Sequence, residues 1–140
     1  MCRSIFARGL AVAAALGAAA VAAQEAYPSR AITLVVPFAA GSGTDIGTRI
    51  LAKDLSEYLG VTVIVDNKPG ANGAIGAQAV ARAKPDGYTL LVGSATTNAA
   101  NFAFFPGKLG YEANSFEIVS GLGASPISLY VAAGAPWRNL

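Results

Sequence analysis

The stretch PFAAGSGTDI, residues 37–46, is the first part of the chain whose residue types can do chemistry. Its glycines let the backbone approach a ligand closely, and Ser42 and Thr44 add hydroxyl groups. Backbone N–H groups at the start of a helix suit a nucleotide phosphate, a catalytic oxyanion or the carboxylate of a small acid. The surrounding residues must decide among these three ligands.

Nucleotide binding does not match the glycine spacing. Gly41, Gly43 and Gly47 form the pattern G-x-G-x-x-x-G, one residue off the dinucleotide-binding fingerprint. Asp66 is the only candidate for the acidic residue that contacts a ribose in that motif. The later stretch GANGAIGAQ lacks the Gly-Lys-Ser/Thr ending of a P-loop. These patterns argue against a nucleotide.

Ser42 is the candidate nucleophile of an alternative function, a secreted serine-type hydrolase. It lies in Ala40-Gly41-Ser42-Gly43, whereas a nucleophile elbow needs Gly-x-Ser-x-Gly. The chain has no histidine, which removes the commonest general base and the commonest metal ligand. Asp45 suits the positive first turn of a helix better than catalysis. We therefore expect no enzymatic activity, no bound metal and no cofactor.

The pattern around this loop predicts an α/β fold. The nearly continuous apolar run Arg30–Phe38 is typical of a strand buried on both faces. A helix is expected over Thr44–Leu59, capped by Ser42 or Thr44 and ended by Gly60. Its apolar residues at helical spacing, expected to form the buried face, are Ile46, Ile50, Leu51, Leu55, Tyr58 and Leu59.

The alternation of strands and helices continues along the chain. A second strand is expected at Val61–Asn67, a helix at Ala74–Ala83 with Ile75 and Val80 inward, and a third strand at Tyr88–Ser94. Residues 95–101 are interpreted as a polar loop or helix start, and 102–116 as a short helix and a loop. Two further strand-like segments are expected at 116–126 and 127–136.

Each predicted strand is followed by a loop rich in Gly, Ser, Thr or Asn: Ala39–Asp45, Lys68–Gly76 and Ser94–Asn98. Strand–helix–strand order implies parallel strands, whose carboxyl ends meet at one edge of the sheet, where ligands bind. One glycine loop needs no explanation beyond a tight turn. Three at one edge favour a small-anion site, with a structural fragment that binds nothing as the remaining alternative.

Residues 1–23 have the features of a signal peptide. Arg3 and Arg8 precede an apolar run of about 15 residues, shorter than the roughly 20 that span a bilayer. Val21 and Ala23 fit the small-x-small rule for cleavage between Ala23 and Gln24. The single cysteine, Cys2, leaves with this segment. Eight basic residues then remain against eight acidic ones, which gives no argument for a nucleic-acid partner.

Four motifs together resemble the Bug-type periplasmic solute-binding proteins of tripartite tricarboxylate transporters. They are Tyr-Pro-Ser-Arg (27–30), Val-Pro-Phe-x-x-Gly-x-Gly-Thr-Asp (36–45), Asn-x-Pro-Gly-Ala-x-Gly (67–73) and Pro-Asp-Gly-Tyr-Thr-Leu (85–90). The resemblance covers residues 27–140. It implies a periplasmic-binding-protein-like (type II, Venus-flytrap) fold with two hinged domains. It also implies a small carboxylate ligand (a di- or tricarboxylate, an amino acid or an aromatic acid), membrane permease subunits as partners, and a monomer when full-length.

The resemblance further implies that one ligand carboxylate is held largely by backbone amides and ordered water. The matching positions in the three loops are Phe38, Ala39, Gly41, Ser42, Gly43, Thr44 and Asp45; Asn72, Gly73, Ala74 and Gly76; and Ser94, Ala95, Thr96, Thr97 and Asn98. The first loop has the greatest weight. We expect Asp45 to order this loop rather than touch an anionic ligand, because like charges repel.

Family members are roughly twice as long as this chain. We therefore interpret residues 24–140 as the N-terminal part of the first domain, with the second domain absent. The missing half would supply the opposite wall of the cleft and the strands that complete this sheet. An incomplete sheet leaves an unpaired edge and apolar surface exposed.

We predict that the 140-residue chain alone is unstable or aggregates, and that it binds carboxylates poorly, because half of the cleft is missing. Thermal melts of the purified chain with and without carboxylates measure both properties. A reversible, cooperative melt that shifts upward with ligand would contradict this prediction.

Overall fold

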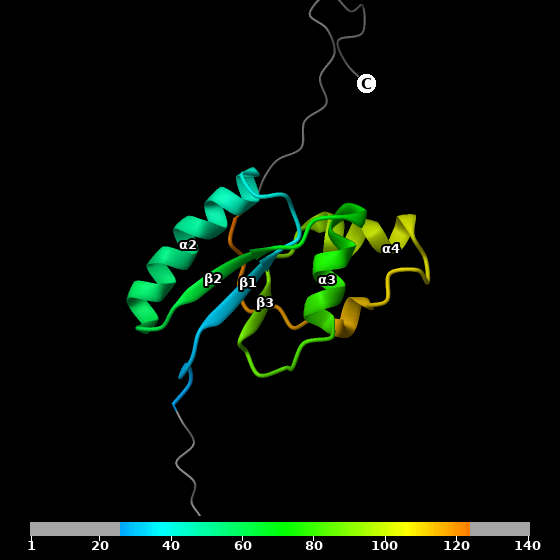
Figure 1. Cartoon of the computed structure of the whole chain (residues 1–140). Coiled ribbons are helices and arrows are strands. Elements are labelled where there is room, and N and C mark those ends of the chain that lie inside the picture. The colour runs from blue at the N-terminus through cyan, green and yellow to red at the C-terminus, as the bar shows by residue number, and fades with distance from the viewer. Residues whose placement is uncertain (1–25, 124–140) are drawn as a thin grey trace, which may run out of the picture.

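The computed structural model describes residues 26–123 (Figure 1). The predicted signal peptide and the predicted strand at 127–136 lie outside these residues. In chain order the elements are β1 (Ile32–Val36), α2 (Gly43–Leu59), β2 (Val63–Asn67), η2 (Ala71–Gly73), α3 (Ala74–Ala81), β3 (Thr89–Leu91), η3 (Thr96–Ala100), α4 (Asn101–Phe104) and η4 (Ala113–Ser115). The predicted order of the first three strands and two helices is therefore confirmed.

The three strands form one parallel sheet in the order β2-β1-β3. The register pairs Val36 of β1 with Asn67 of β2, and Val35 with Leu91 of β3. The carboxyl ends of all three strands are therefore aligned. This arrangement confirms the predicted α/β class and brings the loop that follows each strand to the same edge.

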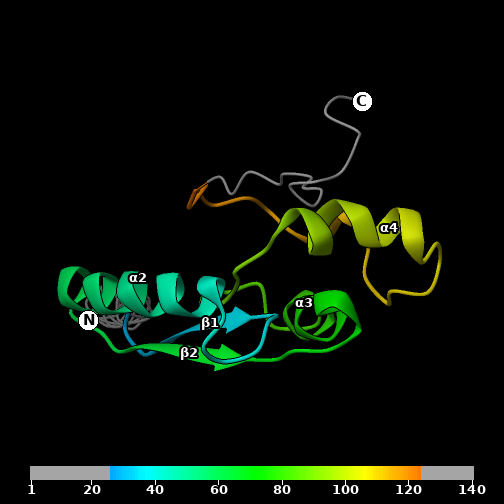
Figure 2. The same cartoon turned by 90° about the horizontal axis from the view of Figure 1, so that it is seen from above.

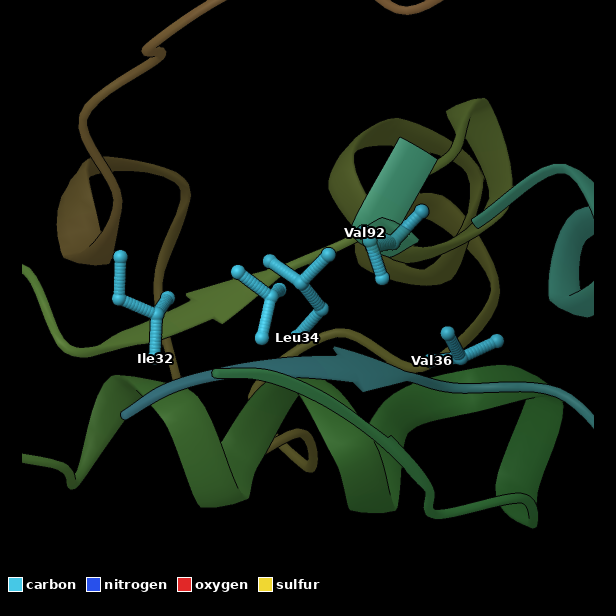
Figure 3. Packing of buried hydrophobic residues seen from close by; sticks show 6 residues of the cluster. Ile32, Leu34, Val36 and Val92 are labelled. Carbon is cyan, nitrogen blue, oxygen red and sulfur yellow. The ribbon is translucent and has the colours of Figure 1, made fainter. Parts of the chain in front are cut away.

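Alternate residues of β1 build the core on one face of the sheet. Ile32, Leu34 and Val36 are buried in a cluster with Ala52 of α2 and Val92, and Figure 3 shows the three β1 side chains on the same side of the strand. In β3, Leu90 packs against this cluster, whereas Leu91 packs against a second cluster around Ala77 of α3, Leu109 and Tyr111. Because successive strand residues point to opposite faces, α2 and α3 cover opposite faces of the sheet.

Both predicted ends of α2 are confirmed. Of the two candidate N-caps the structure uses Ser42, whose side chain accepts a hydrogen bond from the N–H of Asp45 at 3.3 Å. Gly60 ends the helix in the left-handed conformation, with φ of 68°, and its N–H donates to the carbonyl oxygen of Ser56 at 3.0 Å.

The predicted buried face of α2 is partly wrong. Ile46, Ile50 and Tyr58 are 55%, 62% and 86% exposed, whereas Asp45, Thr48 and Ala52 are buried. The prediction ranked positions by the apolar character of their side chains. In the structure, the hydrogen bond from Asn67 of β2 to Asp45 fixes the rotation of the helix, and the small Ala52 allows close approach to the sheet. Thr48 is buried with its hydroxyl bonded to the carbonyl oxygen of Thr44 in the same helix. The same correction holds for Ile75 of α3, which is 53% exposed while Ala77 packs inward.

The strand predicted at 116–126 is wrong for its described part, residues 116–123, which contain no strand. The ring of Phe116 packs against Tyr111 at a centroid distance of 5.7 Å, and Ile118 and Val119 are 88% and 82% exposed. β-branched residues favour a strand only where a neighbouring strand pairs with them. Within the described residues, β1 has β2 and β3 as its neighbours and this segment pairs with none of the three.

The segment after β3 begins as a helix, one of the two interpretations of residues 95–101. The π-helical η3 continues directly into α4, and the views in Figures 1 and 2 agree in placing α4 beside α3. The predicted short helix and loop at 102–116 are confirmed by α4 and the turns that follow it.

Candidate functional site

The first loop exposes backbone N–H groups at the start of α2. Gly43 and Thr44 are the first two residues of the helix, so their N–H groups have no acceptor within it, and both residues are exposed. The N–H of Ser42 is bonded to the carbonyl oxygen of Ala39 at 3.2 Å. Gly41 turns the chain with φ of +82°, a conformation that glycine adopts without strain. The loop therefore presents two free donors at a helix N-terminus, where the helix dipole also favours an anion.

The carboxylate of Asp45 holds this loop in place. It is 2% exposed and accepts three hydrogen bonds: from the N–H of Gly41 at 2.8 Å, from Arg49 Nε at 3.0 Å and from Asn67 Nδ2 at 2.9 Å. These bonds, with that of Arg49 first, lower the pKa of Asp45 from 3.8 to about 2 against the opposing effect of burial. Asp45 is thus ionised at neutral pH and orders the loop, as expected from the sequence.

Asn67, the last residue of β2, ties the loop to the sheet. Its Nδ2 donates to the carbonyl oxygen of Phe38 at 3.2 Å as well as to Asp45, and its Oδ1 accepts from Arg49 Nη2 at 2.9 Å. Asn67 and Arg49 were not among the predicted site residues. The i,i+4 spacing of Asp45 and Arg49 was a detectable signal for an ion pair, whereas nothing local indicates that Asn67 lies beside them.

The second loop runs through four successive residues with positive φ: Gly70 at 120°, Ala71 at 47°, Asn72 at 52° and Gly73 at 84°. Positive φ is strained for Ala71 and sparsely populated for Asn72, so neighbouring contacts must stabilise this conformation. One such contact comes from Asn101, which is fully buried and whose Nδ2 donates to the carbonyl oxygen of Asn72 at 3.1 Å.

The three loops pack against one another at Gly73 and Gly76. A Cβ atom at Gly73 would lie 2.6 Å from Cγ2 of Thr97 in the third loop and 3.2 Å from Cβ of Pro37, which leads from β1 into the first loop. A Cβ atom at Gly76 would lie 3.0 Å from Cα of Pro37 and from the carbonyl oxygen of Lys68. The predicted convergence of the three loops at one edge is therefore confirmed, and glycine is required there by close approach.

The third loop is closed by hydrogen bonds around Thr97, which is fully buried. Its hydroxyl accepts from the N–H of Ser94 at 2.9 Å and donates to the carbonyl oxygen of Ser94 at 3.1 Å. The carbonyl oxygen of Thr97 accepts from the hydroxyl of Tyr111 at 2.8 Å. The polar groups of Thr97 are therefore engaged within the protein, and the exposed residues of this loop are Ala95 and Asn98.

The predicted site residues fall into three groups by exposure. The exposed ones are Ala39, Gly41, Gly43, Thr44, Asn72, Ala95 and Asn98. The partly buried ones are Phe38, Ser42, Ala74, Ser94 and Thr96, and the buried ones are Asp45, Gly73, Gly76 and Thr97. The four buried residues pack or order the loops, which leaves the backbone amides of the exposed residues and the side chains of Thr44, Asn72 and Asn98 as groups that can meet a ligand.

A hollow of about 140 Å³ borders the second loop and is lined by Ala71, Ala74, Phe105, Lys108 and Leu109. The free N–H groups of Gly43 and Thr44 are not part of its wall and lie on open surface. Across residues 26–123, no three His, Cys, Asp or Glu residues are grouped to hold a metal ion, and no helix is long and apolar enough to cross a bilayer.

The chain belongs to the tripartite tricarboxylate transporter family of receptors, TctC, whose family model matches residues 48–140. This confirms the resemblance seen in the sequence motifs. Protein BugT of Bordetella pertussis is 42% identical over 100 residues, which are 71% of this chain and 30% of BugT. The chain spans between 26% and 41% of the length of the curated relatives that it matches.

Two solved structures from Rhodopseudomonas palustris share this fold. MatC with bound malate is 42% identical with a TM-score of 0.59, over 63% of this chain and 30% of MatC. A second R. palustris protein with adipate is 39% identical with a TM-score of 0.59, over 63% of this chain and 29% of that protein.

Substituting Gly73 by alanine tests the packing of the three loops. We expect Gly73→Ala to lower the free energy of unfolding by about 1–3 kcal/mol, because the new Cβ meets Thr97 and its φ is positive. Gly47→Ala is the matched control. Gly47 lies in α2 with nothing within 4 Å of a new Cβ, so this substitution should raise the free energy of unfolding by about 0.5–1 kcal/mol. Urea denaturation followed by circular dichroism measures both, and an equal effect of the two variants would contradict the packing.

The hydrogen bonds of Asp45 predict a pH dependence of stability. Its folded-state pKa of about 2 lies below the ordinary 3.8, so between these values the unfolded state binds more protons. The stabilisation from Asp45 should therefore be complete above about pH 4 and disappear as the pH falls toward 2. Urea midpoints of the unsubstituted chain and Asp45→Asn, measured from pH 5 to pH 2, should converge at low pH. A constant difference would refute this linkage.

Proposed function

We propose that this chain is part of the periplasmic substrate-binding component of a tripartite carboxylate transporter, and that its three loops bind one carboxylate of a small organic acid. The observation that carries this proposal is the pair of free N–H groups of Gly43 and Thr44 at the start of α2, in the loop that follows β1 at the carboxyl edge of the sheet. Malate and adipate, which occupy the two similar solved structures, are both dicarboxylates and support this ligand class.

The geometry of the first loop suits a carboxylate because its donors are fixed before the ligand arrives. Asp45 and Asn67 hold the loop to α2 and β2, so little backbone freedom is lost on binding. Malate and adipate differ in length and substituents but share a terminal carboxylate. Loop amides that recognise this shared group leave selectivity among acids to the surroundings of the rest of the ligand.

The wider organisation follows from the family. We propose that residues 1–23 are a signal peptide cleaved near Ala23 and that residues 24–140 form part of the first domain of a hinged two-domain receptor. Membrane permease subunits are the proposed partners, as the name of the family implies, and a monomer is the proposed state of the full-length receptor. No nucleic-acid partner and no cofactor are proposed.

A receptor role without catalysis fits the first loop better than the hydrolase alternative. The family is a receptor family, and Ser42 Oγ caps α2 by accepting from the N–H of Asp45. The neighbouring carboxylate of Asp45 is bonded to Gly41, Arg49 and Asn67, which occupies the nearest candidate base. The reading of the chain as a structural fragment without a ligand is likewise not favoured by its membership of a receptor family.

Gly43→Pro tests the proposed role of the backbone amide, because proline removes the N–H group of residue 43. Proline is well tolerated at the first position of a helix, and Ser42 already has the extended conformation (φ −66°, ψ 159°) that proline requires of the preceding residue. Gly43→Ala is the matched control, since it keeps the N–H and its Cβ meets nothing within 4 Å.

Titration of the ¹⁵N-labelled chain with malate and with adipate measures binding even when it is weak. We expect the amide signals of Gly43 and Thr44 to shift, and Gly43→Pro to weaken binding about tenfold or more relative to Gly43→Ala, because a hydrogen bond to a charged group is lost. Equal binding by the two variants would refute the proposed role of this amide.

A further inference from the structure

The first loop contains an electrostatic conflict. The carboxylate of Asp45 is 2% exposed and is bonded to the N–H of Gly41, within the same loop that is proposed to accept a carboxylate. Two like charges a few ångströms apart repel each other strongly when one of them is withdrawn from water, and this repulsion is enough to abolish weak binding. A loop built around a buried anion therefore needs compensation before it can bind a second anion.

Arg49 is placed to supply that compensation. Its Nε lies 3.0 Å from Asp45 Oδ2, and within residues 26–123 it is the cation that forms an ion pair with this carboxylate. Its Nη2 donates to Asn67 Oδ1 at 2.9 Å, so the guanidinium is held between α2 and β2. Arg49 lies beyond the first turn of α2, and its bonds to Asp45 and Asn67 account for the position of the guanidinium.

We propose that Arg49 is a positioning residue that neutralises Asp45 and thereby permits the first loop to accept a carboxylate. The proposal rests on the proposed function and names the residue that makes an anion acceptable there. Arg49 acts through Asp45 and need not touch the ligand. The carboxylate of Asp45 is retained because it accepts from Gly41, Arg49 and Asn67 together, and the charge of Arg49 removes its electrostatic penalty.

A double-mutant cycle separates the effect of the charge of Arg49 from the effect of its hydrogen bond to Asn67. The four proteins are the unsubstituted chain, Arg49→Gln, Asp45→Asn and the double variant, titrated with malate and adipate as in the amide experiment. We expect Arg49→Gln to weaken binding about tenfold when Asp45 is present, and less than about twofold when residue 45 is asparagine. Equal losses of affinity with Asp45 and with Asn at residue 45 would mean that Arg49 only supports the loop structurally, and would overturn the proposal.

Two further variants keep the test informative if Arg49→Gln perturbs the fold. Arg49→Lys preserves the positive charge but not the planar guanidinium group, and its affinity should lie within about threefold of that of the unsubstituted chain. Lys53→Gln removes an exposed positive charge one turn further along α2 that makes no ion pair with Asp45, and it should leave binding unchanged. If Arg49→Lys binds as poorly as Arg49→Gln, or Lys53→Gln causes the same loss, neutralisation of Asp45 is refuted.

Titration of the Asp45 carboxyl carbon by NMR does not depend on a ligand. Arg49→Gln should raise the pKa of Asp45, and an unchanged pKa would overturn the proposal even where the chain binds malate. If the pKa rises but the amide signals of Gly43 and Thr44 do not shift even at the highest soluble concentrations of malate and adipate, carboxylate binding by the first loop fails while the neutralisation of Asp45 by Arg49 holds. The two failures are therefore distinguishable.

Discussion

The structure of the candidate site depends on one buried carboxylate. Asp45 begins the buried face of α2, and its oxygens hold the turn at Gly41, the side chain of Arg49 and the end of β2 at Asn67. Each of these donors belongs to a different local element, so the same group fixes the loop, the rotation of the helix and its docking on the sheet. Burial of such a charge is tolerated because every donor around it is aligned and one of them is a cation.

The other two loops are fixed by steric fit rather than by charge. Gly73 and Gly76 lie so close to Pro37, Thr97 and Lys68 that a side chain would collide. The positive φ angles at 70–73 are held partly by the hydrogen bond from Asn101 to Asn72. Backbone amides cannot reorient independently of the chain, so the geometry of the proposed site must be set by the residues that support the loops. Here those supports are an ion pair on one side and close packing on the other.

Much of the fold was predictable because its signals are local. A continuous apolar run marks β1, Ser42 and Gly60 mark the ends of α2, and strand–helix–strand order implies a parallel sheet with loops at one edge. The rotation of α2 was not predictable from hydrophobic spacing, because Ile46 and Ile50 are more apolar than the Asp45 and Thr48 that face inward. The strand prediction for residues 116–123 was wrong for a related reason, because β propensity cannot show whether a partner strand is present.

The sequence by itself determined the chemistry available to this protein: no histidine for a base, a loop rich in Gly, Ser, Thr or Asn after each strand, and a capped helix start that favours an anion. The tertiary structure decided which groups stand together there. Asn67 meets Asp45 across 22 residues of sequence because the parallel register places the end of β2 beside the end of β1. That contact depends on sheet pairing and helix docking, which are set by the whole core, so no short stretch of sequence could indicate it.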